Sequence, residues 1–191
     1  MSYSGIGFGF PIETSVKRKV FVSYHHGGDQ AYYAAFAKAF CEVYDVIYDN
    51  SLDRRVDSED LGYVMRRIRE DYVTGSSCTI VLVGKETPVR KYVDWEVKAT
   101  LDKQHGLIGV QLPTAPVRLQ GTISVPTRLN DNINSGYALW LSWGQITANS
   151  QQLARYIAMA NAKAKKLIVN NRDRRLRNGG QPTCPFQRAR F

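Results

Sequence analysis

Short apolar runs and amphipathic stretches alternate along the chain. Apolar residues, many of them β-branched or aromatic, concentrate at 19–24, 46–48, 78–84, 107–112 and 137–143. Between these runs, apolar residues recur every three or four positions over 29–44, 61–72, 93–101 and 151–169, which is the spacing of one buried helix face. The pattern predicts five strands that alternate with helices.

In the run at 78–84, CTIVLVG, the apolar residues are continuous, whereas in a half-exposed strand they would alternate with polar residues. We therefore expect it to be the central strand of a parallel sheet covered on both faces. Regular alternation of strands and helices predicts an α/β fold, a flavodoxin-like, doubly wound parallel sheet of five strands with helices on both faces. Residues 113–136 show no periodicity and contain several Pro, Gly and Asn, so we expect an irregular insertion there.

A chain of 191 residues suits one domain. We expect a flexible leader at 1–18, the domain at 19–170 and a basic tail at 171–191. Of the net charge of +9, nearly all follows residue 162, since 163–191 hold nine Lys or Arg against one Asp. Such a charge block is typical of a solvated, flexible terminus, with an acidic partner or RNA as the alternative.

Several classes of protein are excluded by what the chain lacks. No apolar run reaches the roughly 20 residues that cross a bilayer, which predicts a cytoplasmic protein without membrane contact. Three widely spaced cysteines fit reduced thiols and show no metal-ligand spacing, so we expect no metal. The glycine-rich motifs of dehydrogenases and phosphate-loop proteins are absent, and no aspartate ends the central strand as in a phosphoacceptor receiver.

In doubly wound sheets, ligands collect at the carboxyl ends of the strands, near the point where the strand order reverses. This directs attention to Ser23, Tyr24 and His25 after the first strand, and to Asp49 and Asn50 after the second. Their hydroxyl, imidazole and carboxylate groups could contact a ligand. The same residue types also cap helices and form turns, so that alternative stays open.

Three blocks of sequence carry a resemblance to a known family. They are KVFVSYH at 19–25, VLVGKET at 81–87 and RKYVDWE at 90–96. Together they resemble the TIR-like domains of bacterial anti-phage defence, most closely the ThsB family of Thoeris systems. In the third block, Tyr92 stands four positions before Glu96, as an aromatic residue does in TIR domains. Most TIR domains carry Trp-Cys where this chain has Tyr92 and Val93, and here a tryptophan, Trp95, stands three positions later.

The resemblance implies an enzyme that binds NAD as a substrate rather than as a cofactor and cleaves its nicotinamide–ribose bond. Glu96 would be the catalytic residue, and Tyr92 and Trp95 would lie at the pocket. The product would be an ADP-ribose-derived signalling nucleotide, such as a cyclic ADP-ribose isomer, that activates a partner effector. A phage-derived trigger and self-association are further implied partners.

A non-catalytic alternative remains open. If Glu96 lies in the first turn of a helix, the helix macrodipole favours a glutamate there whatever its function. The chain would then be a TIR-like adaptor that acts by self-association. RNA binding through the basic tail is a third reading, which the scarcity of aromatic residues in the tail does not favour.

Overall fold

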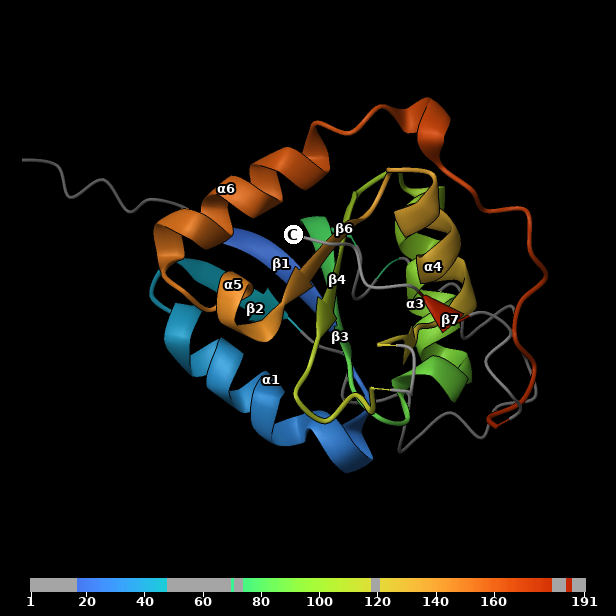
Figure 1. Cartoon of the computed structure of the whole chain (residues 1–191). Helices are drawn as coiled ribbons and strands as arrows, with labels where there is room; N and C mark the ends of the chain where they lie inside the picture. Colours follow the sequence, from blue (N-terminus) through green and yellow to red (C-terminus); the bar gives the residue numbers. More distant parts are fainter. Residues whose placement is uncertain (1–16, 48–69, 71–73, 118–120, 180–184, 187–191) are drawn as a thin grey trace, which may run out of the picture.

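A five-stranded parallel sheet forms the centre of the fold in the computed structural model, which describes residues 17–47, 70, 74–117, 121–179 and 185–186. The strands lie in the order β2-β1-β3-β4-β6, and every neighbouring pair is parallel (Figure 1). Their bounds are Arg18–Ser23 for β1, Tyr44–Ile47 for β2, Ser76–Val83 for β3, Gly106–Gln111 for β4 and Leu139–Ser142 for β6. The predicted parallel sheet is confirmed.

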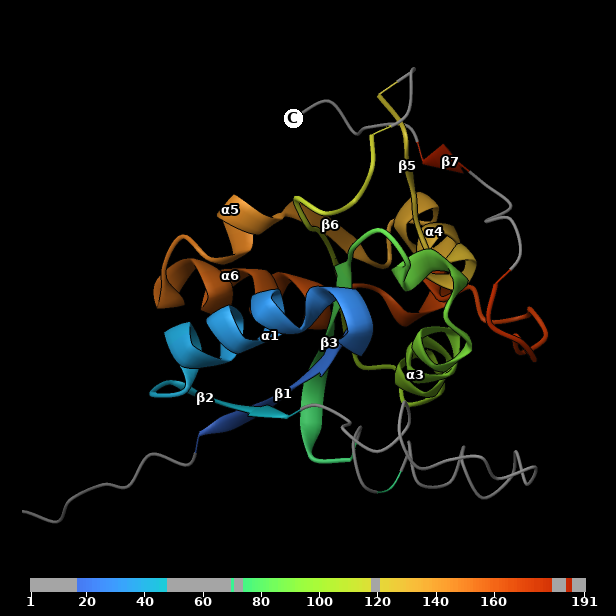
Figure 2. The ribbon, with the colours of Figure 1, turned by 90° about the horizontal axis from the view of Figure 1, so that it is seen from below.

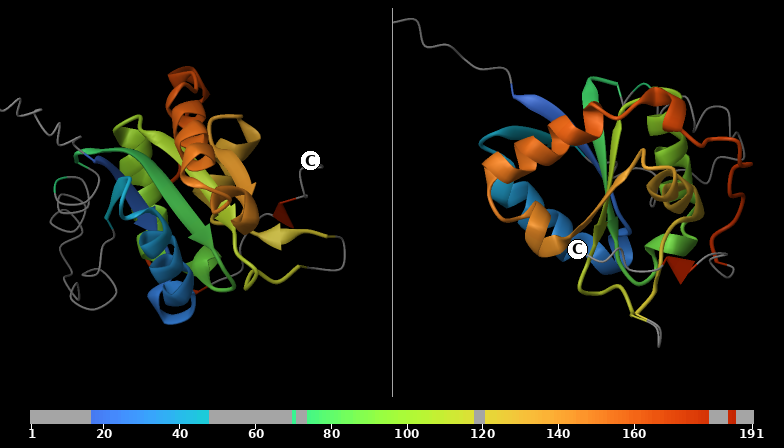
Figure 3. Two further views of the ribbon diagram at one scale, coloured as in Figure 1. Left: turned by 90° about the vertical axis from the view of Figure 1, so that its left-hand side faces the viewer. Right: turned by 45° about the horizontal axis from the view of Figure 1, so that its top comes forward.

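Helices cover both faces of this sheet (Figure 2). Helices α1, α5 and α6 lie on one face, and α3 and α4 lie on the other, as Figure 3 also shows. Their bounds are His26–Phe40 for α1, Lys91–Asp102 for α3, Thr127–Asn134 for α4, Trp143–Ile146 for α5 and Ser150–Asn161 for α6. The architecture is therefore the predicted flavodoxin-like α/β fold.

Strand β3 is the central strand, and its continuous apolar run has a direct structural reason. Ile80 and Leu82 pack into the apolar cluster beneath α1 and α6, whereas Val81 and Val83 pack into the cluster beneath α3 and α4. All four side chains are 0% exposed. Successive residues point to opposite faces of a strand, so a strand covered on both faces carries consecutive apolar residues instead of an apolar–polar alternation.

The strand order reverses between β1 and β3, because β2 follows β1 along the chain but lies on the side of β1 away from β3. At such a reversal the connections leave toward opposite sides, and a crevice opens at the carboxyl ends of the strands. The residues after β1 and β3 therefore lie where sheets of this type bind ligands. These residues begin at Tyr24 and Gly84.

A buried carboxylate holds the loops together at this edge. Asp29 of α1 is 2% exposed and accepts hydrogen bonds of 3.0 Å from the hydroxyls of Thr87 and Thr114. The Thr87 hydroxyl in turn accepts one from the Gly84 N–H at 3.0 Å. Because these residues follow β1, β3 and β4, their hydrogen bonds fix three loops relative to one another.

Replacing Gly84 by alanine is expected to disrupt this arrangement. An added Cβ would lie 2.1 Å from Asp29 Oδ1, and Asp29 cannot move without losing its two threonine partners. We expect Gly84→Ala to lower the free energy of unfolding by about 1–3 kcal/mol, as overpacking of a core does. Urea unfolding measures the loss.

Gly144→Ala is the matched control. Gly144 lies in α5, and an added Cβ there would meet no atom within 4 Å. Alanine in a helix is favoured over glycine by roughly 0.5–1 kcal/mol, so this variant should be as stable as the parent or more so. Equal losses in the two variants would show that contact with Asp29 is not the cause.

The prediction of one long helix over 151–169 is wrong beyond residue 161. Helix α6 ends at Asn161, and the short 3-10 helix η3 follows at Lys165–Leu167. Leu153 and Ile157 pack into the cluster under α1 and α6, whereas Ile168 packs against the cluster under α3 and α4. These clusters lie on opposite faces of the sheet, so a single straight helix cannot place its apolar residues in both.

The expectation of an irregular segment over 113–136 is also wrong in part. The segment contains strand β5, Ile123–Ser124, and helix α4, Thr127–Asn134. Strand β5 pairs antiparallel with β7, Pro185–Phe186. Helix α4 spans eight residues and contributes Leu129 and Ile133 to the core, which is too short a pattern for periodicity to reveal.

Two further predictions concern residues that lie almost wholly outside the described ranges. The leader predicted at 1–18 lies outside them except for its last two residues, and Arg18 already belongs to β1. The helix predicted over 61–72 lies outside them except for Glu70. It therefore stays a prediction.

Candidate functional site

Glu96 lies in the second turn of α3, not in the first as expected. The helix begins at Lys91, so Glu96 is its sixth residue, and the acidic residue of the first turn is Asp94. Glu96 is only 6% exposed. The favourable effect of the macrodipole on an acid falls off within the first turn and stabilises exposed carboxylates, so it does not account for a buried glutamate here.

A pair of threonines fixes how α3 lies along β3. The hydroxyl oxygens of Thr79 on β3 and Thr100 on α3 lie 2.7 Å apart. Because α3 returns antiparallel to β3, Glu96 lies one helical turn from Thr100 toward the carboxyl end of the strand. One turn spans about 5.4 Å and two strand residues about 6.6 Å, which brings Glu96 to the level of Val81.

Strand β1 places Ser23 at the level of Val81, and therefore at the level of Glu96. Ser23 pairs in register with Val81 of β3. Val20, Val22 and Tyr24 pack into the cluster under α1 and α6, so alternation along the strand turns Ser23 to the opposite face, which α3 covers. Ser23 and Glu96 therefore share one face of the sheet and one level along it.

The Ser23 hydroxyl has no hydrogen-bond partner among the residues that the structure describes, although the residue is 1% exposed. A buried hydroxyl that stays unpaired costs about 1–3 kcal/mol. Buried polar groups in folded proteins are therefore paired with protein atoms, water or a ligand. An unpaired hydroxyl at the level of a buried carboxyl is the feature that marks this position as a candidate active site.

The other residues expected at the loop after β1 lie elsewhere. The Tyr24 ring stacks on Tyr33 at 4.7 Å on the face under α1, and its hydroxyl donates to Gln30 at 2.8 Å. His25 lies at the edge of the sheet, with Nε2 3.9 Å from the Glu86 carboxylate, which also pairs with Arg90. The structure does not bring Tyr24 to the face of Glu96.

Asp49 and Asn50 lie outside the described residues. Their contact with a ligand stays a prediction. They follow β2, which pairs with β1 in the sheet.

Tyr92 and Trp95 contact each other on α3, with ring centroids 5.4 Å apart in an edge-on arrangement. The ammonium of Lys91 lies 4.9 Å from the Tyr92 ring centroid and 5.5 Å from that of Trp95. Trp95 is 1% exposed, and its indole N–H donates to the Arg175 carbonyl at 2.8 Å. Trp95 is thus a packing residue beneath the C-terminal segment rather than an open wall of a pocket.

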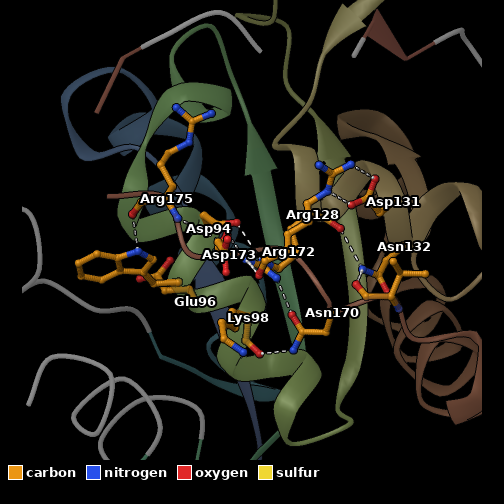
Figure 4. Close-up of polar contacts among 12 residues, drawn as sticks. Asp94, Glu96, Lys98, Arg128, Asp131, Asn132, Asn170, Arg172, Asp173 and Arg175 are labelled. Carbon is orange, nitrogen blue, oxygen red and sulfur yellow. Dashed lines mark hydrogen bonds and ion pairs between the residues drawn. The ribbon is translucent and has the colours of Figure 1, made fainter. Parts of the chain in front are cut away.

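The C-terminal segment itself departs from the expected flexible tail. Residues 169–179 cross α4 and α3 as an ordered strap (Figure 4). Asn132 of α4 makes two hydrogen bonds with the backbone of Val169, at 2.8 and 3.0 Å. The Asn170 amide donates to Asp102 at the end of α3 at 2.8 Å. The prediction of a flexible tail is therefore wrong for 171–179.

Arg128 of α4 anchors the strap. Its side chain is 0% exposed and pairs with Asp94 of α3, with Nε 2.9 Å from Oδ1. The remaining N–H groups donate to the Asn170 side chain at 2.7 Å and to the carbonyls of Arg172 and Asp173, both at 3.1 Å. A guanidinium that would be costly to bury alone thus joins α3, α4 and the strap into one unit.

Neither Arg128 nor the strap was found from the sequence. An arginine is almost never fully buried unless it is paired, and its partners here are 34 to 45 positions away. Periodicity over a short window carries no signal for such contacts.

The described residues show no sign of a reactive Cys78 thiol, of a metal site or of a membrane-spanning helix. Burial raises the pKa of the Cys78 thiol to about 12, so this group is protonated at neutral pH and is a poor nucleophile. Within the described ranges, no group of three or more His, Cys, Asp or Glu is arranged to hold a metal ion. Of the helices in the same ranges, none combines the length and apolar character that crossing a bilayer requires.

Comparison with models of protein families gives a match for this chain. The family model described as Thoeris protein ThsB, TIR-like domain, matches residues 21–117, about half of the 191 residues. A comparison with curated proteins finds no match. The matched range runs from β1 to just beyond β4 and includes both Ser23 and Glu96. The chain belongs to the ThsB family of TIR-like domains, from the Thoeris system of anti-phage defence.

Proposed function

We propose that this protein cleaves the nicotinamide–ribose bond of NAD, with Glu96 as its catalytic carboxylate. The proposal is carried by the burial of Glu96 together with that of the Ser23 hydroxyl, which has no hydrogen-bond partner among the described residues. The strand register and the rise of α3 put both at one level of the same sheet face. Membership of the ThsB family supports it, because TIR-like domains commonly use NAD as a substrate.

The chemistry needs a single carboxylate. The bond between N1 of the nicotinamide and C1′ of the ribose breaks, and its electron pair leaves with the nicotinamide as a neutral molecule. Positive charge develops on the ribose, and the Glu96 carboxylate opposite it lowers the barrier. The burial of Glu96 strengthens this effect, since charges interact more strongly away from water. No second carboxyl is needed as a general acid, because the leaving group is already neutral.

The C1′ atom then bonds to water or to another group of the same nucleotide. Reaction with water gives ADP-ribose, and reaction with a group of the same nucleotide gives a cyclic ADP-ribose isomer. In the defence system, such an ADP-ribose-derived nucleotide diffuses to a partner effector and activates it. A phage-derived trigger starts the reaction.

Mass spectrometry of the purified protein incubated with NAD tests the proposal. We expect nicotinamide and an ADP-ribose-derived product, with more of both after addition of lysate from phage-infected cells. The adaptor function gives a different result. In that case NAD is unchanged with and without lysate, while the protein self-associates.

Ser23→Ala is expected to slow this reaction by about 2- to 10-fold, the effect of losing one hydrogen bond to the substrate. The free energy of unfolding should stay the same or rise, because the hydroxyl that is removed has no partner among the described residues. Steady-state kinetics and urea unfolding measure the two quantities.

Ser77→Ala is the control, since Ser77 is an exposed serine of β3 whose hydroxyl, among the described residues, accepts only a long hydrogen bond of 3.4 Å, from the Asn161 amide. It should change neither the rate nor the stability. Loss of stability in Ser23→Ala without a change in rate would assign the Ser23 hydroxyl to folding instead of to substrate.

A further inference from the structure

The outer part of the strap presents a fixed basic ridge, which we define as residues 174–177 with the sequence Arg-Arg-Leu-Arg. Both the N–H and the carbonyl of Arg175 form hydrogen bonds with side chains of α3. The Arg175 N–H donates to Asp94 at 3.0 Å, and the Arg175 carbonyl accepts from the Trp95 indole at 2.8 Å. The ridge therefore has a defined conformation on α3, in which Leu176 and Arg177 are exposed and Arg174 and Arg175 are partly exposed.

Two more hydrogen bonds fix the chain just beyond the ridge. The side-chain oxygen of Asn178 accepts from the N–H of Lys91, the first residue of α3, at 2.9 Å. The Gly179 N–H donates to the Val89 carbonyl at 3.0 Å. With both ends held, the ridge loses little conformational entropy when a partner binds.

No carboxylate of the described residues neutralises the charge of the ridge. Arg174, Arg175 and Arg177 make no ion pair with any carboxylate among the described residues, and Asp173 is the last acidic residue of the chain. Three guanidinium groups without an ion-pair partner in the described part of the chain thus lie within four consecutive residues. An acidic surface is the chemical complement of such a cluster.

A hollow of about 480 Å³ lies beside the ridge, and its charged lining consists of three arginines and two aspartates: Arg90, Arg172, Arg175, Asp94 and Asp173. Asp94 is already paired with Arg128. Arg90 pairs with Glu86, and Arg172 pairs with Asp131. Arg175 instead donates to the Gly179 carbonyl, which leaves most of its N–H groups for a carboxylate that enters the hollow.

Leu176 makes the ridge better suited to binding a protein than to binding a nucleic acid. Leu176 is 66% exposed, the most among the large apolar residues of the described ranges. An isolated exposed leucine is ordinary, but this one is fixed between two arginines, and arginine with an apolar anchor is typical of protein interfaces. A phosphate backbone offers no partner for a leucine, and the ridge has no aromatic residue on which a base could stack.

We propose that the basic ridge is a docking site for a protein partner whose surface carries carboxylates around an apolar socket. The socket receives Leu176, and the carboxylates pair with Arg174, Arg175 and Arg177. The partner is then seated over α3, the helix that carries Glu96. Docking at this surface does not depend on the reaction proposed above.

Selection from a display library of random 12-residue peptides on the full-length protein tests the proposal. Enriched peptides are expected to combine several Asp or Glu with an aliphatic or aromatic residue. Their affinity, measured by fluorescence anisotropy, should fall at least tenfold in Arg174→Ser/Arg177→Ser and at least about fivefold in Leu176→Ser. The melting temperatures should stay near that of the parent, because the contacts that hold the ridge are made by its backbone.

Arg18→Ser/Lys19→Ser is the matched control, because it removes two exposed positive charges from β1 at the opposite end of that strand from Ser23. It should leave peptide affinity within twofold of the parent. Equal losses in both double variants would overturn the proposal, since attraction would then follow net charge alone. Enriched peptides without acidic residues would overturn it too.

A labelled 12-nucleotide oligouridylate distinguishes nucleic acid from protein. If it binds the parent, loses affinity in Arg174→Ser/Arg177→Ser and keeps full affinity in Leu176→Ser, while no acidic peptide is enriched, the ridge is a nucleic-acid site. That result would overturn the assignment to a protein partner.

Discussion

Arg128→Met is expected to lower the free energy of unfolding by about 3–5 kcal/mol, which is the usual loss when one partner of a buried ion pair is removed. Methionine keeps the length of the side chain but donates no hydrogen bond. Asp94, whose side chain is 13% exposed, would lose its charged partner, and the carbonyls of Arg172 and Asp173 would lose their donor. Urea unfolding monitored by tryptophan fluorescence measures the effect.

Arg172→Met is the matched control for this substitution. Arg172 also pairs with an aspartate, Asp131, but its side chain is 47% exposed. Exposed ion pairs contribute about 0–1 kcal/mol, so this variant should lose less than about 1 kcal/mol. Hydrogen exchange should also become faster at the amides of 169–179 in Arg128→Met alone. Similar losses in the two variants would mean that Arg128 does not anchor the strap.

The central sheet could be predicted because its signal is local. In β3, Val81 and Leu82 face different helices, so apolar residues follow one another along 80–83, and such a run is visible in the sequence. The separate placement of Ser23 and Tyr24 was also predictable. Alternation puts Tyr24 with Val20 and Val22 on one face and leaves Ser23 on the other.

The turn of α3 in which Glu96 lies could be assigned only once the first residue of the helix was known from the structure. With α3 beginning at Lys91, a residue expected in the first turn lies in the second, where the macrodipole no longer explains it. Arg128 and the strap could not be predicted from local pattern, because each contact joins residues more than 30 positions apart. The charged side chain of Arg128 suggests exposure, and only the pairing seen in the structure explains its burial.

Glu96→Gln is expected to lower the rate of NAD cleavage by about 10²- to 10³-fold. Glutamine keeps the size and the hydrogen-bonding shape of the side chain but removes the negative charge that opposes the developing ribosyl cation. The loss of one preorganised electrostatic contact has an effect of this size. The melting temperature and the elution volume in gel filtration should stay near those of the parent, because the substitution leaves the packing of α3 unchanged.

The most direct measurement is the initial rate of nicotinamide release from NAD, followed by mass spectrometry under identical activating conditions for the parent, Glu96→Gln and Glu42→Gln. Glu42 is an exposed glutamate just after α1, so its substitution makes the same chemical change away from the candidate site. We predict that Glu42→Gln keeps the parent rate while Glu96→Gln falls by at least about 10²-fold. A Glu96→Gln variant that releases nicotinamide at a rate comparable to the parent would contradict the assignment of Glu96 as the catalytic carboxylate.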